Sequence, residues 1–253
     1  MEIKVLGSFG GSTRTARLTN FLINNSLALD AGCLTQTLSL KQQHCITNVI
    51  ISHSHMDHIT SLPFLVDNLF GQTVAPLNIW GSTHVIHCLR THIFNDVIWP
   101  DFTKIQFNGT PSILFHTLTS RTSFSIGDLQ ITPIPVNHIV PTHALYIEDQ
   151  NGGFLFSSDT STTDEIWQFV NQKEKLKAII VDCSFPNEME DLAIMSGHMT
   201  PTLLARDLKK LESDCDIYIY HAKSSFEKLL HQQLDDLNLS KLHRNIQGQI
   251  ITV

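Results

Sequence analysis

Four side chains that commonly bind metal ions lie close together after an apolar segment: His53, His55, Asp57 and His58. The preceding run, Val49-Ile50-Ile51, is short and β-branched, which is typical of a buried strand. Side chains two residues apart leave an extended chain on the same side, so His53 and His55 can hold one ion. Asp57 and His58 reach a second ion only if the chain turns, and the helical spacing of residues 59–70 predicts that turn. A histidine-rich polar loop is the alternative, but the ligand preferences of zinc favour a metal site.

Three further strands are predicted to end at a metal-binding side chain. Residues 129–136 precede His138, residues 153–158 precede Asp159, and the strand that starts at Ile217 ends at His221. Asp159 has an alternative role as a capping acid for the helix that follows it. We predict two sets of ligands, one made of His53, His55 and His138 and the other of Asp57, His58 and His221, with Asp159 bridging the two ions.

Such a site leaves coordination positions open to solvent, as catalytic zinc sites do and structural ones do not. Two ions roughly 3.5 to 4 Å apart that share a hydroxide supply a nucleophile at neutral pH and bind the charged oxygens of a phosphoryl group. Asp57 is placed to orient that hydroxide as well as to bind metal. The predicted chemistry is therefore metal-dependent hydrolysis.

Other polar or aromatic features have less specific signals. The glycine-rich turn at residues 10–14 lacks a P-loop lysine, so we interpret it as a connecting loop. Residues 92–102 contain three aromatic side chains and a proline, which could form a lid that stacks on a base or could make core or dimer contacts. Residues 83–94 are predicted to form a helix on which His84 and His87 share a face, but nothing else indicates that they are ligands.

Composition limits the class of protein. The chain has 253 residues, of which 42% are hydrophobic, so it can bury a core, and we expect one domain over residues 1–253. No apolar run reaches the roughly 20 residues that span a bilayer, and residues 1–7 do not resemble a signal peptide, so we expect a cytoplasmic protein. The five cysteines form no C-x-x-C pair and are expected to be free thiols.

The formal net charge of −7 argues against a long nucleic acid as the partner, because nucleic-acid binding depends on clustered lysine and arginine. Two divalent ions would bring the sum of −7 and +4 to −3, with the positive charge concentrated at one site. A small anionic substrate is compatible with that balance.

The H-x-H-x-D-H pattern of residues 53–58 resembles the signature of the metallo-β-lactamase superfamily, and the order and spacing of all seven predicted ligands match it along nearly the whole chain. The resemblance implies a four-layer αββα sandwich with a dinuclear metal site at the sheet edge. We expect two pseudo-symmetric halves, roughly residues 1–112 and 113–253. The resemblance also implies that Asp30, in an Asp-x-Gly motif, supports the histidine loop without binding metal. Asp159 as a bridge indicates phosphodiester or thioester hydrolysis, because true β-lactamases lack that carboxylate.

Several finer motifs are similar to those of the class II cyclic-nucleotide phosphodiesterases; they lie at residues 53–63, 92–102, 136–141, 184–187 and 196–201. This resemblance implies hydrolysis of 3′,5′-cyclic nucleotides such as cAMP or cGMP to 5′-monophosphates by two divalent ions, with zinc expected and manganese or iron as alternatives. His198 would be the general acid, or alternatively a structural histidine, and Lys223 would bind the phosphate, or alternatively be a solvated lysine. Thr142-His143 departs from the small residues of that family and could alter the nucleotide pocket.

Three other functions remain open. A tRNA 3′-processing endonuclease of the same superfamily would have the same ligands and a comparable His198 motif, but no RNA-docking arm or basic surface is evident. A glyoxalase-type thioesterase would need a further substrate domain. A catalytically silent metal-binding protein is the alternative from a different class. The aromatic segment also leaves a homodimer possible.

Overall fold

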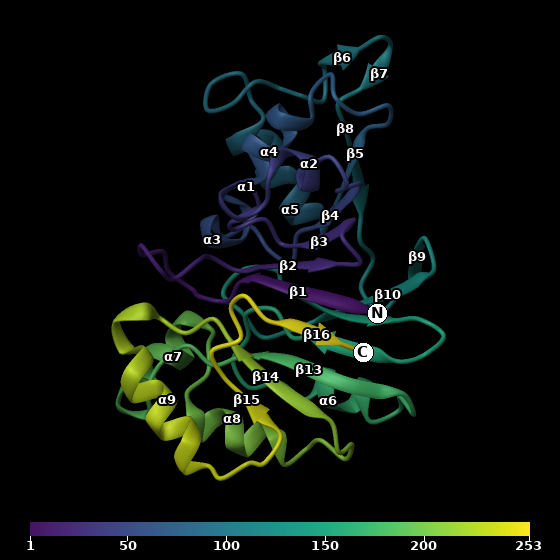
Figure 1. The fold of residues 1–253 in the computed structure, drawn as a ribbon. Helices are drawn as coiled ribbons and strands as arrows, with labels where there is room; N and C mark the ends of the chain where they lie inside the picture. The colour runs from purple at the N-terminus through teal and green to yellow at the C-terminus, as the bar shows by residue number, and fades with distance from the viewer.

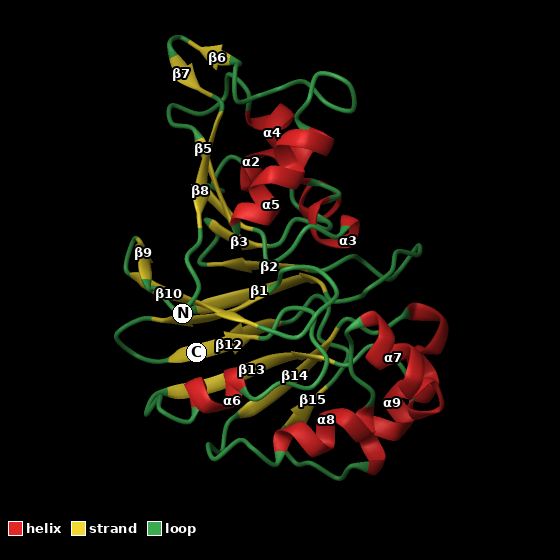
Figure 2. Ribbon diagram, turned by 180° about the vertical axis from the view of Figure 1, so that it is seen from behind, coloured by secondary structure: helices red, strands yellow, loops and turns green.

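The computed structural model describes residues 1–253 and contains two large β-sheets that pack face to face (Figure 1). Helices cover the outer face of each sheet, so the molecule has four layers (Figure 2). This arrangement confirms the predicted αββα sandwich. None of the helices is both long and apolar enough to cross a membrane.

The first sheet has seven strands: β1 (Glu2–Gly7), β2 (Asn20–Ile23), β3 (Leu27–Leu29), β4 (Asn48–Ile50), β5 (Leu77–Gly81), β8 (Ile113–Thr117) and β16 (Ile250–Thr252). Their order is β16-β1-β2-β3-β4-β5-β8. Neighbours from β16 to β3 are antiparallel, whereas β3, β4, β5 and β8 are parallel. The carboxyl ends of the parallel strands therefore meet at one edge of the sheet.

The second sheet also has seven strands: β9 (Phe124–Ile126), β10 (Leu129–Pro135), β11 (His143–Glu148), β12 (Gly153–Phe156), β13 (Leu176–Asp182), β14 (Asp216–Tyr220) and β15 (Leu242–His243). It repeats the pattern of the first sheet, with antiparallel pairs from β9 to β12 and parallel pairs from β12 to β15. The sheets do not divide the chain at residue 112, because β8 and β16 both belong to the first sheet.

Two groups of helices form the outer layers. The first group is α1 (Leu34–Thr37), α2 (Leu40–Gln43), α3 (Met56–Ile59), α4 (Leu62–Leu69), α5 (Thr83–Cys88) and the π-helix η1 (Leu89–Ile93). The second group is α6 (Glu165–Val170), η2 (Asn187–Met189), α7 (Glu190–Ser196), α8 (Pro201–Leu208), η3 (Ser224–Phe226) and α9 (Glu227–Asp236). A small separate hairpin is made of β6 (Gln106–Phe107) and β7 (Thr110–Pro111).

Three clusters of buried apolar residues hold these layers together. One lies between the sheets, where the rings of Phe21, Phe156 and Tyr220 contact one another at centroid distances of 5.2 to 5.8 Å. The other two lie between each sheet and its helices. The sheets are thus apolar on both faces, which explains the near-continuous apolar runs of their parallel strands.

Helix boundaries differ from the predicted ones at two places. The predicted helix over 59–70 is two helices, α3 and α4, and α3 already begins at Met56. Asp57 and His58 therefore lie within a helical turn, which provides the change of direction that a second set of ligands needs. The predicted helix over 83–94 ends as an α-helix at Cys88 and continues as a π-helical turn.

The aromatic segment at 92–102 contributes to the core. Phe94 and Phe102 are buried in the cluster under the first group of helices. Trp99 packs edge-on against Phe64 of α4, with ring centroids 5.1 Å apart. Of the two interpretations, core packing holds for Phe94 and Phe102. A dimer contact through this segment stays a prediction.

Candidate metal centre and active site

All seven predicted ligands lie together where the carboxyl ends of the parallel strands of both sheets meet. They form two groups that share Asp159: His53, His55, His138 and Asp159 in one, and Asp57, His58, Asp159 and His221 in the other. Within each group the potential ligand atoms lie within 4.8 Å of one another. The loop after β4 and helix α3 supply four of these side chains, and the loops after β10, β12 and β14 supply one each.

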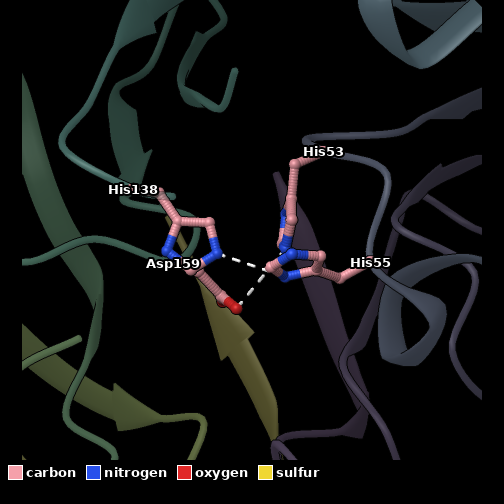
Figure 3. Close-up of side chains that lie close together, drawn as sticks. All are labelled: His53, His55, His138 and Asp159. Carbon is pink, nitrogen blue, oxygen red and sulfur yellow. Dashed lines mark hydrogen bonds and ion pairs between the residues drawn. The ribbon is translucent and has the colours of Figure 1, made fainter. Parts of the chain in front are cut away.

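In the first group the side chains point toward a common centre (Figure 3). His138 Nε2 lies 3.2 Å from His55 Nδ1, and His53 Nε2 lies 3.6 Å from Asp159 Oδ2. Two ring nitrogens that face each other at this distance can share at most one proton, because an imidazole nitrogen donates only when it is protonated. A cation between them would use both lone pairs.

The second group is centred on the same carboxylate oxygen. His221 Nε2 lies 3.1 Å from both Asp57 Oδ2 and Asp159 Oδ2, and His58 Nε2 lies 3.2 Å from Asp159 Oδ2. His221 has a φ of 72°, in the left-handed region that is unfavourable for a side chain of this kind. Such strain costs about 1–3 kcal/mol and is typical of functional sites.

Three ligand atoms are buried without a hydrogen-bond partner: His53 Nε2, His58 Nε2 and Asp159 Oδ2. Buried polar atoms are almost always hydrogen bonded, and leaving one unsatisfied costs about 1–3 kcal/mol. Two imidazole nitrogens and a carboxylate oxygen are the donors that divalent metal ions take in proteins. The residues present therefore fit a pair of divalent ions.

The pKa values of four of the five predicted histidine ligands are lowered, which favours the neutral imidazole that binds metal. Burial, together with neighbouring imidazoles, lowers the pKa of His53 well below its usual range and that of His55 to about 4. Burial likewise lowers the pKa values of His138 and His221. His58 differs, because the carboxylates of Asp159 and Asp30 outweigh its burial and raise its pKa. The two carboxylates therefore favour a positive charge at His58, and a cation bound beside Nε2 would supply that charge.

Asp30 connects the histidine loop to strand β3. Its carboxylate accepts hydrogen bonds from the Ser52 backbone N–H at 2.8 Å and from the Ser52 hydroxyl at 3.0 Å. The other ring nitrogen of His58 lies 2.7 Å from Asp30 Oδ2. Asp30 lies outside both ligand groups and orients the ring of His58, the arrangement by which carboxylates usually support a metal-binding histidine.

His198 lies beside the ligands without belonging to either of the two four-residue groups. Its ring stacks on that of His221 with centroids 4.9 Å apart, and its Nδ1 lies 2.7 Å from Asp182 Oδ2. Burial lowers the pKa of His198, but the Asp182 carboxylate outweighs burial and leaves the pKa above its usual value. Thr200 caps α8 and Pro201 is its first residue, which fixes the turn that carries His198.

Asp182, Ser184 and Tyr220 also contact the site, although none of them is among the predicted site residues. Ser184 lies between Asp182 and the two histidines His198 and His221. The Tyr220 hydroxyl donates a hydrogen bond to Asp159 Oδ1 at 3.0 Å, which satisfies the oxygen of Asp159 that does not face the ligands. Asp182 is the last residue of β13, and Asp159 lies shortly after the end of β12. The position at a strand end that indicated Asp159 as a site residue therefore also indicates Asp182.

The glycine-rich turn is more than a connection. The carbonyl of Gly10 accepts a hydrogen bond from Lys223 Nζ at 3.0 Å, and Lys223 Nζ lies 6.0 Å from the centroid of the Phe185 ring. A Cβ atom at Gly10 would lie 2.4 Å from Cε1 of His221. The turn therefore packs directly against a predicted ligand and the predicted phosphate-binding lysine.

The histidines of α5 lie outside the ligand groups. His84 Nε2 contacts Cys88 Sγ at 3.5 Å and Ser54 Oγ at 3.4 Å, and His87 makes no contact with a predicted ligand. His143, in the segment that departs from the related family, contacts the Ser120 hydroxyl at 2.7 Å.

Comparison with known proteins agrees with this geometry. The curated relatives include "Probable 3′,5′-cyclic-nucleotide phosphodiesterase" of Yersinia pestis, which is 28% identical over 96% of this chain and 83% of its own length. They also include "3′,5′-cyclic-nucleotide phosphodiesterase 1" of Saccharomyces cerevisiae, 25% identical over 71% of this chain. This chain spans just over half of that yeast protein, 57%.

Among solved structures, unliganded yeast PDE1 superposes with a TM-score of 0.82 at 20% identity, over 100% of this chain and 99% of the other. At that identity the match establishes the fold. The model of the family described as "Beta-lactamase superfamily domain" matches residues 19–219, which include every predicted metal ligand except His221. The chain therefore belongs to the β-lactamase superfamily.

Proposed function

We propose that this protein is a metal-dependent phosphodiesterase that hydrolyses 3′,5′-cyclic nucleotides, cAMP or cGMP, to nucleoside 5′-monophosphates. The observation that carries the proposal is the set of buried ligand atoms without hydrogen-bond partners beside a histidine that a carboxylate orients. The relatives named as cyclic-nucleotide phosphodiesterases support it.

In this proposal the seven side chains hold two divalent ions, and zinc is the expected metal. His53, His55 and His138 would hold one ion, Asp57, His58 and His221 would hold the other, and Asp159 would serve both. When bound, such a pair of ions lowers the pKa of a water molecule toward neutrality and offsets the negative charge of the phosphoryl oxygens. Asp30 would keep His58 in position, and Asp57 would also accept a hydrogen bond from the attacking water.

His198 acts as the general acid. The water loses a proton and its oxygen forms a bond to phosphorus, the bond from phosphorus to O3′ breaks, and His198 gives its proton to O3′. The proton released by the water returns His198 to its acid form through solvent. Asp182 accepts the hydrogen bond from Nδ1, so the opposite nitrogen, Nε2, is the one that carries the transferable proton. Asp182 raises the pKa of His198 above its usual value and so favours the acid form that this role requires.

Lys223 binds the phosphate. The Gly10 carbonyl and the face of Phe185 hold its ammonium group next to His198 and His221, where no carboxylate forms a salt bridge with it. An ammonium group without a carboxylate partner at an active site is suited to an anionic substrate. The net charge of −7 favours a small anion of this kind over a long RNA.

Side-by-side turnover of cAMP, cGMP and a precursor tRNA by the purified, metal-loaded protein tests the proposal. We expect opening of a cyclic nucleotide, no tRNA cleavage, and about two divalent ions per chain by elemental analysis. Asp159→Asn is the negative control, because it removes the charge that both ions share. Cleavage of tRNA without turnover of a cyclic nucleotide would show that the endonuclease alternative is right.

We also propose a cytoplasmic location. All five cysteines are free, and none is paired with another in a disulfide. Free thiols are typical of proteins kept in a reducing compartment.

A further inference from the structure

Ser184 occupies a position from which one hydroxyl contacts three groups of the site. The side chain is fully buried. Its Oγ lies 2.6 Å from Asp182 Oδ1, 2.9 Å from His221 Nδ1 and 3.3 Å from His198 Nδ1. A hydroxyl has a single proton to donate and two lone pairs to accept with, so the direction of that proton decides what each neighbour must do.

Asp182 fixes the direction. An ionised carboxylate only accepts hydrogen bonds, so Ser184 donates its proton to Oδ1. The other carboxylate oxygen, Oδ2, is already occupied by Nδ1 of His198 at 2.7 Å and by the Thr160 backbone N–H at 3.1 Å. With its proton committed to Asp182, Ser184 can only accept from His221 Nδ1.

Two of the other histidine ligands have partners that can only accept. His58 Nδ1 faces the Asp30 carboxylate at 2.7 Å, and His138 Nδ1 faces the Gly197 carbonyl at 2.9 Å. Both of these partners can only accept, so each fixes the ring in the form that carries its proton on Nδ1 and leaves Nε2 free. His221 instead faces a hydroxyl, which can also donate. The form of His221 that binds metal therefore depends on where the Ser184 proton points.

We infer that Ser184 is a positioning residue that keeps the proton of His221 on Nδ1 and its Nε2 free for metal, and that it does so because Asp182 accepts the Ser184 proton. Asp182 thereby orients the general acid directly and one metal ligand through a hydroxyl. The inference rests on the metal site of the proposed function but not on the substrate.

Ser184→Ala tests the first step in the zinc-loaded protein. We expect the zinc ion held by His221 to bind about 10–100-fold more weakly, the usual effect of losing the partner of a metal-binding histidine, while the ion held by His53, His55 and His138 keeps its affinity. The NMR signal of the His221 Nδ1 proton should broaden or disappear because the proton loses its acceptor. Chelator competition measures the two affinities separately.

The matched control is Ser61→Ala. Ser61 is equally buried, and its hydroxyl donates to the Ala31 carbonyl at 2.6 Å and accepts from the Leu34 N–H at 2.9 Å, but it contacts no imidazole. A general loss of packing would weaken both ions alike in both variants. Unchanged zinc affinities and an unchanged His221 proton signal in Ser184→Ala would overturn the inference, as would equal weakening of both ions.

Asp182→Asn tests the second step. The amide oxygen must stay where the His198 and Thr160 N–H groups point, so the amide NH₂ faces Ser184 and turns the hydroxyl proton toward His221 Nδ1. That proton opposes the metal-binding form, so the same zinc ion should be weakened about as much as in Ser184→Ala. The double variant should be no weaker than the single ones. Fully additive losses would show that Asp182 acts by another route and would overturn the inference.

These measurements use zinc and no nucleotide. The selective loss of one zinc ion would stand even if cyclic nucleotides were not hydrolysed, so failure of the substrate assignment and failure of the Ser184 assignment give different results.

Discussion

Replacing His198 with alanine should slow hydrolysis of cAMP without removing metal. The His198 ring is held by Asp182 at 2.7 Å, and the carboxylate leaves the pKa of His198 above its usual value, which favours the protonated form. The variant therefore loses the whole contribution of the acid. General acid catalysis typically supplies about 10²–10⁴-fold, which corresponds to about 2.7–5.4 kcal/mol of transition-state stabilisation at 1.36 kcal/mol per factor of ten.

The assay compares two substrates. The leaving group of cAMP is an alkoxide at O3′, which needs a proton, whereas the leaving group of bis(4-nitrophenyl) phosphate is a phenolate, which needs none. His198→Ala should thus lose about 10²–10⁴-fold in kcat with cAMP but less than about tenfold with the activated diester. Elemental analysis of the same sample should still give the wild-type metal content.

The control is His116→Ala. His116 lies in β8, the edge strand of the first sheet, where it stacks on Trp80 at 4.2 Å and contacts Asn78 of β5 at 2.8 Å. Its replacement therefore removes a packed imidazole away from the ligands. An equal loss on both substrates in His198→Ala would refute the assignment of His198 as an acid. Loss of metal would show that His198 supports the ligands instead.

Three further predictions follow from the same geometry. Gly10→Ala should lower kcat/KM for cAMP at least about tenfold, because its Cβ would lie 2.4 Å from the His221 ring and 2.6 Å from Lys223 Nζ. The control Gly11→Ala, whose Cβ has no neighbour nearer than 4.0 Å, should match wild type. Equal activities of the two variants would refute the clash. Protein saturated with metal at about 1,000 Kd gains about 4.1 kcal/mol of stability per site. Because about 2–4 °C of Tm accompanies each kcal/mol in a domain of this size, removing the ions with a chelator should lower Tm by about 8–16 °C per site. An unchanged Tm in a calorimetric scan would contradict the metal site. As pH rises, kcat should fall only above the ordinary histidine pKa of 6.5, because His198 must be protonated and Asp182 raises its pKa. Asp182→Asn should move that fall to lower pH. An unmoved profile would contradict the pairing of His198 with Asp182.

Much of the fold and the positions of the ligands could be predicted from local pattern. A parallel strand buried on both faces is an apolar run, and the polar residue that ends it must lie at the sheet edge. That rule places the histidine loop after β4, Asp159 after β12 and His221 after β14. His138 follows β10, an antiparallel strand, and the structure brings all of them together. The seven-residue arrangement therefore needed only strand ends and residue types.

The rest depends on contacts that local pattern does not encode. Gly10 lies 213 positions from Lys223 in sequence, and they meet because Phe9 pairs with Ala222 as an isolated bridge between the two sheets. Ser184 gains its importance only from the simultaneous positions of Asp182, His198 and His221 on three separate segments. A serine in a loop has no local signature for that role.

The location of bound metal tests the central claim most directly. A crystal structure of the zinc-loaded protein, with anomalous scattering recorded at the zinc edge, should show two peaks: one among His53, His55 and His138 and one among Asp57, His58 and His221, with Asp159 contacting both. An absence of peaks there in zinc-saturated crystals, or a single peak held by other residues, would contradict the account.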